Sequence, residues 1–166
     1  MDFSKQLQLW ANGDASQGRV MVVVGILLSI AAILILRGDN PILKGMLIPM
    51  GLVILVSLGY GGFLSYSRPQ HITKTQELYS QNNSEAVAQE LKKAETDNRN
   101  YTVIKPVWAT LMMIALILFF VVTKDYYKGL SMGLMGLSLF GFLLDTFLHA
   151  NLKPYLSLLR QLAEGS

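Results

Sequence analysis

Four long apolar segments constrain this chain more than any other feature of its sequence. They cover residues 20–36, 42–66, 106–123 and 129–150. A bilayer core of about 30 Å needs roughly 20 helical residues, because each residue of an α-helix rises about 1.5 Å. The sequence therefore predicts an all-α integral membrane protein with four transmembrane helices.

The composition of the whole chain agrees with this prediction. Hydrophobic residues make up 52% of the 166 residues and charged residues only 15%, whereas a soluble domain carries about 25% charged residues. The absence of cysteine excludes a disulfide-stapled secreted domain, and 14 glycines without a period exclude a collagen-like repeat. The low charge and the apolar segments exclude a disordered chain.

The first apolar segment is expected to be an uncleaved span rather than a signal peptide. Its run of 17 apolar or small residues between Arg19 and Arg37 is longer than the h-region of about 7–15 residues that signal peptides carry. The residues after Leu36 also lack a small-residue cleavage site.

Short connections at residues 37–41 and 124–128 predict two helical hairpins. Polar sequence surrounds the hairpins, and we expect five units. They are an N-terminal interfacial amphipathic helix over 1–17, a hairpin over 18–66, a cytoplasmic helical segment over 67–105, a second hairpin over 106–150, and a C-terminal amphipathic helix over 151–166.

The basic residues predict the orientation of the chain. Four spans place both termini and the middle segment on one side of the membrane, and that side holds ten of the 14 Lys and Arg residues. By the positive-inside rule, the termini and middle segment are expected in the cytoplasm, with the protein in the cell inner membrane. The net charge of +3 then reflects topology and contact with anionic lipid, and no nucleic-acid partner is predicted.

Each polar segment shows a weak helical pattern. Phe3, Leu7 and Trp10 recur at helical spacing, which predicts a helix lying along the membrane surface. In the middle segment, Gln81-Asn82-Asn83 separates two helical stretches. Towards the C-terminus, Pro154 predicts a kink at the membrane exit.

A narrow apolar stripe in the second of these stretches is a candidate partner-binding surface. Val87, Leu91 and Ala94 share one helical face. A stripe this thin cannot build a core by itself. It must therefore lie on the membrane, on another part of this chain, or on a partner.

Small residues mark two helices for close packing. The last span carries Gly129, Gly133 and Gly136, and the second span carries Ser57, Gly61 and Ser65. Such spacing lets helix backbones approach closely in lipid. Either the second and fourth spans pack together within one bundle, or one stripe forms an interface between copies. The first and third spans lack such stripes and are expected to face lipid.

Four polar residues at similar predicted depth form a candidate cluster: Asp145, His149, Arg68 and His71. An acidic group within a span is costly and usually faces protein or water. The cluster has three interpretations: a structural clamp in which Asp145 pairs with Arg68 or His149, a proton-coupled gate, or a metal or catalytic site. The ligand set of two His and one Asp is thin for a metal, and no cofactor is predicted.

Catalytic motifs do not point to an enzyme, since the chain has no H-E-x-x-H, no G-x-S-x-G and no P-loop. We therefore expect a small non-enzymatic membrane protein that binds a protein partner, as a complex subunit, an assembly factor, or an immunity protein that blocks a membrane-acting toxin. One alternative is a homo-oligomeric channel or small transporter with Asp145 and His149 in its pathway. A membrane-embedded lipid-active enzyme is a third.

Overall fold

The computed structural model describes residues 2–164, and this part of the chain is helical with no strand. Its elements are α1 (Phe3–Arg37), α2 (Pro41–Gln81), α3 (Asn83–Val121) and α4 (Asp125–Glu164). Among the described residues, all four helices are long and apolar enough to cross a membrane. The prediction of an all-helical chain with four candidate spans is confirmed at this level.

Local sequence explains where the helices begin. Asn40 caps α2 by accepting hydrogen bonds from the backbone N–H groups of Ile42 and Leu43, and Pro41 occupies the first helical position, where its missing N–H costs nothing. Asn82 separates α2 from α3 and caps α3 through the N–H of Glu85. The predicted break at residues 81–83 is therefore confirmed.

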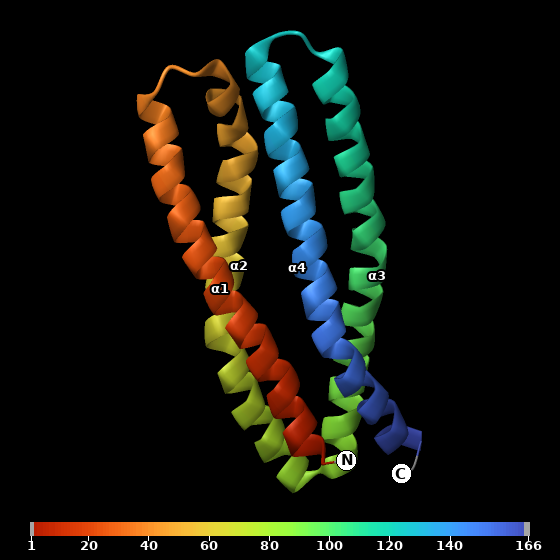
Figure 1. Cartoon of the computed structure of the whole chain (residues 1–166). Coiled ribbons are helices and arrows are strands. Elements are labelled where there is room, and N and C mark those ends of the chain that lie inside the picture. Colours follow the sequence, from red (N-terminus) through yellow and green to blue (C-terminus); the bar gives the residue numbers. More distant parts are fainter. Residues whose placement is uncertain (1, 165–166) are drawn as a thin grey trace.

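The helices are arranged so that both chain ends and the α2–α3 turn lie together, opposite the α1–α2 and α3–α4 connections (Figure 1). Helix α1 packs along α2, and α3 packs along α4. Helices α2 and α4 also pack against each other, whereas α2 and α3 touch little. The two central helices therefore join the two outer ones.

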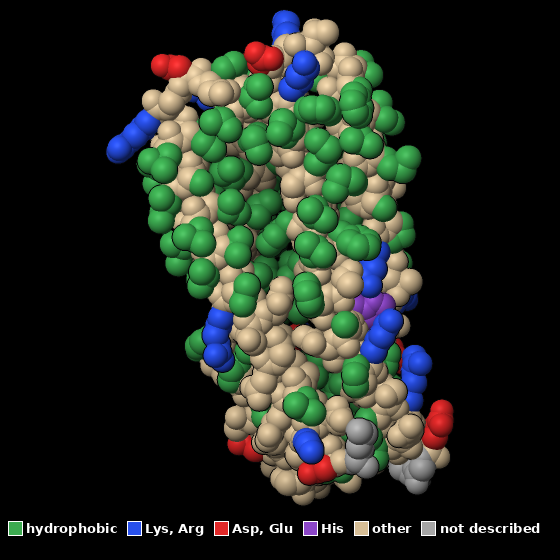
Figure 2. All heavy atoms as spheres, in the orientation of Figure 1, with side chains coloured by type: hydrophobic (Ala, Val, Ile, Leu, Met, Phe, Trp, Pro, Cys, Tyr) green, Lys and Arg blue, Asp and Glu red, His purple; other side chains and the backbone are tan. Residues whose placement is uncertain are grey.

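The molecule has two zones. Hydrophobic side chains cover the part nearer the α1–α2 and α3–α4 connections, and charged side chains gather at that tip and over the opposite part (Figure 2). Nearest the termini, all four helices enclose a separate apolar core. We call this second zone, residues 3–18, 68–101 and 151–164, the base.

Aromatic stacking organises the core of the base. The ring centroids of Trp10 and Tyr155 lie 4.9 Å apart, and those of Phe3 and Tyr79 lie 4.2 Å apart. Leu7 and Leu159 are completely buried beside them. The polar segments that the sequence places outside the spans therefore pack on one another.

This packing corrects the prediction of separate amphipathic helices. The N-terminal stretch is the first part of α1, and Phe3, Leu7 and Trp10 are buried inside the base instead of lying on the membrane surface. The C-terminal stretch continues α4 through Pro154 to Glu164. Residue 1 and residues 165–166 of the two predicted terminal units lie outside the described residues. The apolar faces of these segments cover one another, so they do not need lipid.

The stripe predicted to bind a partner is also used inside the chain. Val87 and Ala94 are buried in the core of the base, and Leu91 packs against that core. Of the three locations open to this stripe, the structure selects another part of the same chain. Val87 and Ala94 are therefore not available to a partner.

Close packing between α2 and α4 depends on glycines near the α1–α2 and α3–α4 connections. A Cβ added to Gly129 would overlap the backbone carbonyl of Ile42, and one added to Gly45 would overlap that of Tyr126. Gly133 lies against Pro49 and Met46. Two of the three small residues predicted on the last span therefore pack within the chain.

The small residues of the second span pack on α1 rather than on α4. Gly61 faces the backbone of Gly18, and Ser57 lies beside Gly25. Ser65 also lies against Gly18. The expected packing of this stripe on the fourth span is wrong, and so is the expectation that the first span lacks small residues for close contact. Gly18 and Gly25 are seven residues apart and face the same way.

Two glycines of α4 offer a matched test of this packing. We expect Gly129→Ala to destabilise the protein by about 1–3 kcal/mol, the usual range for overpacking, because its methyl group has no space. Gly136→Ala should be neutral or stabilising, since no atom lies within 4 Å of its Cβ position. Thermal unfolding in detergent measures both, and equal effects would contradict the close approach of α2 and α4.

Candidate functional site

The predicted cluster of four polar residues is divided between two places. Asp145 accepts a hydrogen bond from Nε1 of Trp108 at 2.5 Å, which joins α4 to α3. His149 lies one helical turn further along α4 and contacts Asn98 and Lys105 of α3. Asp145 therefore pairs with neither Arg68 nor His149, and that form of the clamp is wrong. Trp108 therefore joins α3 to α4 through this hydrogen bond.

The contacts of His149 define its protonation. Its Nδ1 lies 2.9 Å from Nζ of Lys105, which can only donate, so Nδ1 accepts. Its Nε2 lies 2.8 Å from Oδ1 of Asn98 and therefore carries the proton and donates it. His149 is thus a neutral, doubly hydrogen-bonded residue of the α3–α4 interface.

Arg68 finds its partner on α1. Its Nη2 lies 2.8 Å from Oδ2 of Asp14, and its guanidinium carbon lies 4.3 Å from the centroid of the Trp10 ring. Asp14 is only 1% exposed and Arg68 9%. A buried ion pair with a cation–π contact therefore joins the start of α1 to α2 at the edge of the apolar zone.

The pKa of Asp14 shows how strongly burial acts here. Burial raises the pKa of its carboxyl to about 6 from 3.8, and Arg68 and Asn151 lower it only in part. Asp97 adds a small raising effect through its own charge. The carboxyl of Asp14 therefore accepts a proton more readily in the folded protein than in the unfolded chain.

His71 belongs to a second group in the base. Its Nε2 lies 3.0 Å from Oε2 of Glu90, and Tyr155 donates to the same oxygen at 2.9 Å. Burial raises the pKa of Glu90, but hydrogen bonds from His71 and Tyr155, with the charges of His71 and Lys93, lower it further than burial raises it. Glu90 therefore stays ionised and ties α2, α3 and α4 together.

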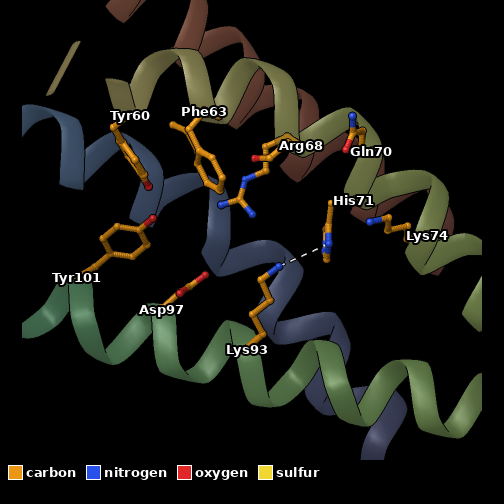
Figure 3. Close-up of a pocket in the computed structure, with 11 residues that line it drawn as sticks. Tyr60, Phe63, Arg68, Gln70, His71, Lys74, Lys93, Asp97 and Tyr101 are labelled. Atoms are coloured by element: carbon orange, nitrogen blue, oxygen red, sulfur yellow. Dashed lines mark hydrogen bonds between the residues drawn. The ribbon is translucent and has the colours of Figure 1, made fainter. Parts of the chain in front are cut away.

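A cleft of about 380 Å³ lies between α2 and α3 beside these groups (Figure 3). Its basic lining residues are Arg68, Lys74 and Lys93, with His71 between them, and Asp97 is its carboxylate. Tyr60 and Tyr101 point their hydroxyl groups toward one another at one end (Figure 3). This cleft brings together two residues of the predicted cluster, Arg68 and His71.

Sequence reasoning missed Asp14, Glu90 and Asp97. The signal for Asp14 was present, because it lies four residues after Trp10 on the apolar face of the first polar segment. An acidic group on such a face needs a buried partner. The partners of Glu90 and Asp97 depend on how α2 and α3 are placed, which no local pattern gives.

The three residues considered for a metal, Asp145, His149 and His71, do not come together. Among residues 2–164, no group of three His, Cys, Asp or Glu side chains is placed to hold a metal ion.

The fold and its four long apolar helices define the class as an all-helical, multipass membrane protein. In the comparisons with known proteins, no family model, no curated protein and no solved structure matches this chain. What it does must therefore be argued from its own residues.

The pair of Asp14 and Arg68 can be tested by a double-mutant cycle. We expect Arg68→Met to destabilise the protein by roughly 3–5 kcal/mol, because it leaves a buried carboxylate without its partner. The double variant Asp14→Leu/Arg68→Met should recover much of this loss. Unfolding in detergent measures both, and a double variant as unstable as Arg68→Met would refute the pairing.

The raised pKa of Asp14 predicts a pH dependence. Between pH 4 and 6 the folded protein holds this proton while the unfolded chain releases it, so the stability due to this group falls as the pH rises. We expect Asp14→Asn to remove that part of the pH slope. Unfolding temperatures at pH 4.5 and 6.5 measure the slope, and an unchanged slope in the variant would rule out the raised pKa.

Proposed function

We propose that this chain is a non-enzymatic inner-membrane protein of two transmembrane hairpins, with the base in the cytoplasm, that acts by binding a transmembrane helix of a protein partner. The distribution of basic residues supports the orientation. One observation carries the proposal of a partner: glycines on a face of α2 that no part of residues 2–164 covers.

This uncovered face runs along the apolar part of α2. Gly51, Gly59 and Gly62 have no atom within 4 Å of the position that a Cβ would occupy. Leu55 and Tyr66 lie on the same face and are 70% and 72% exposed. Spacings of four, four, three and four residues place all five side by side.

Glycine is an unfavourable choice for a helix face that only meets lipid. Each glycine costs about 1 kcal/mol relative to alanine within a helix, and lipid tails do not require a flat surface. A flat surface does favour close approach of a second helix, where packing of backbones drives association in a bilayer. The three glycines therefore support a helix-binding role.

This face differs from the two stripes that the sequence analysis singles out. Ser57, Gly61 and Ser65 contact α1, and Gly129 and Gly133 contact α2, so none is free for another protein. Gly136 has open space beside it and lines an apolar groove with Met50 and Val53. The proposed partner interface therefore lies on the other side of the second span, at Gly51, Gly59 and Gly62.

The channel alternative gains no support from the polar residues of the spans. Ser131 and Ser138 are buried, and their hydroxyl groups donate to backbone carbonyls of their own helix. Asp145 is bonded to Trp108. These residues are used in packing, which favours a binding role over a transport pathway.

A single substitution tests the proposed interface. We expect Gly59→Leu to reduce recovery of a membrane partner several-fold in a crosslinked pull-down from native membranes, because the side chain blocks close approach. Leucine is the better helix former and Gly59 has open space, so the variant should fold.

Ala109→Leu is the matched control, since it adds similar bulk to an exposed position of α3. It should leave recovery unchanged. A pull-down that returns only this chain, or equal loss in both variants, would contradict binding at the α2 face.

A further inference from the structure

The cleft between α2 and α3 lies at the edge of the apolar zone. Tyr60 and Phe63 belong to the second apolar segment, 42–66, and Arg68 follows it within two residues. Lys74 and Lys93 lie further into the base. The cleft therefore begins at the depth of the acyl chains and ends at the depth of lipid headgroups.

Its lining is more basic than acidic. Arg68, Lys74 and Lys93 supply three cations, and Asp97 supplies one carboxylate. Burial raises the pKa of Asp97, although Arg68 and Lys93 lower it in part. The carboxylates of Asp14 and Glu90 lie outside the lining and are engaged with Arg68 and His71.

The side chain of Arg68 is fixed in position within the cleft. The Asp14 carboxylate and the Trp10 ring fix its guanidinium, and the group points toward the centre of the cleft (Figure 3). Its buried Nε has no hydrogen-bond partner among the described residues. A guanidinium fixed in this way is suited to bind an oxygen anion.

The apolar end of the cleft is exposed at the surface of the molecule. Phe63 is 61% exposed and Tyr60 37% exposed, and both line the cleft. Since α2 and α3 touch little, α3 does not cover the aromatic side chains of α2. A ligand in the cleft thus meets charge at one end and exposed aromatic surface at the other.

We propose that the α2–α3 cleft binds the phosphate headgroup of an anionic membrane phospholipid, whose acyl chains lie along Phe63 and the adjoining surface of α2. Lys74 and Lys93 are exposed and contact the phosphate through their ammonium groups, while Arg68 is the fixed donor. A soluble phosphate compound shares the headgroup chemistry, but it gains nothing from the aromatic wall. Basic pockets between transmembrane helices on the cytoplasmic side are suited to such headgroups.

The headgroup end of this site is separate from the proposed partner interface. Tyr60, Phe63 and His71 lie on the side of α2 that faces the cleft. Phe63 lies one turn after Gly59 and borders that interface, but Arg68 and Lys74, which contact the headgroup, lie beyond Tyr66, the last residue of the interface. Substitutions at the headgroup end can therefore abolish lipid binding without affecting partner binding, and loss of partner binding does not by itself predict loss of lipid binding.

The test is thermal unfolding of the full chain in detergent micelles supplemented with phosphatidylglycerol, phosphatidylcholine or glycerol 3-phosphate. We expect phosphatidylglycerol to raise the unfolding temperature more than phosphatidylcholine does, and glycerol 3-phosphate to have no effect. Equal shifts with the two lipids, or an equal shift with glycerol 3-phosphate, would overturn the proposal.

Paired variants locate the site. Lys74→Gln/Lys93→Gln should lose more than half of the shift with phosphatidylglycerol, since it removes two cations from the cleft. Arg37→Gln/Lys124→Gln removes two exposed cations at the opposite end of the molecule and should keep the shift. Retention of the shift by the first pair, or equal loss in both, would place binding elsewhere.

A third variant keeps the proposal testable if the first pair does not fold. Asp97→Asn removes the carboxylate from the cleft lining. We expect it to lower several-fold the phosphatidylglycerol concentration that gives half of the maximal shift. An unchanged or higher concentration would count against anion binding in the cleft.

Discussion

The buried contact between Asp14 and Arg68 sets the relation between the first two helices. These helices run antiparallel, and the same register that pairs Asp14 with Arg68 places Gly18 against Gly61 and Leu64, and Gly25 against Ser57. A slip of α1 along α2 would bury an unpaired carboxylate and push a side chain into a glycine contact, and both changes are costly. Polar and steric constraints therefore select one register.

The base follows from this register and explains the cleft. With α1 fixed, its apolar residues Leu7 and Trp10 cover the ends of α3 and α4, and Tyr155 and Glu90 complete the contact. The base and the α2–α4 glycine contacts thus join the two helix pairs at both ends. Helices α2 and α3 meet little, and charged side chains of the base line the open space between them, beside the apolar zone.

Hydropathy was sufficient to predict the spans, because crossing a bilayer depends on length and apolarity within one segment. The break at residues 81–83 was likewise local, since Asn82 caps α3. The partners of Asp145 and Arg68 were not predictable, because they depend on how each helix is rotated. The sequence placed Asp145 and Arg68 at the same depth and suggested that they pair. In the structure, Asp145 pairs with Trp108 and Arg68 pairs with Asp14. For the same reason, the stripe at Ser57 and Gly61 was assigned to the wrong neighbour.

The central claim is that the polar segments of the chain fold into a base whose helices continue into the apolar segments. Amide hydrogen exchange of the protein in lipid nanodiscs, followed by mass spectrometry, tests it most directly. We predict slow exchange over residues 3–18, 83–101 and 151–162, because their backbone hydrogen bonds are closed within packed helices. Exchange in these segments at the rate of an unfolded chain, with protection confined to the apolar segments, would contradict the account.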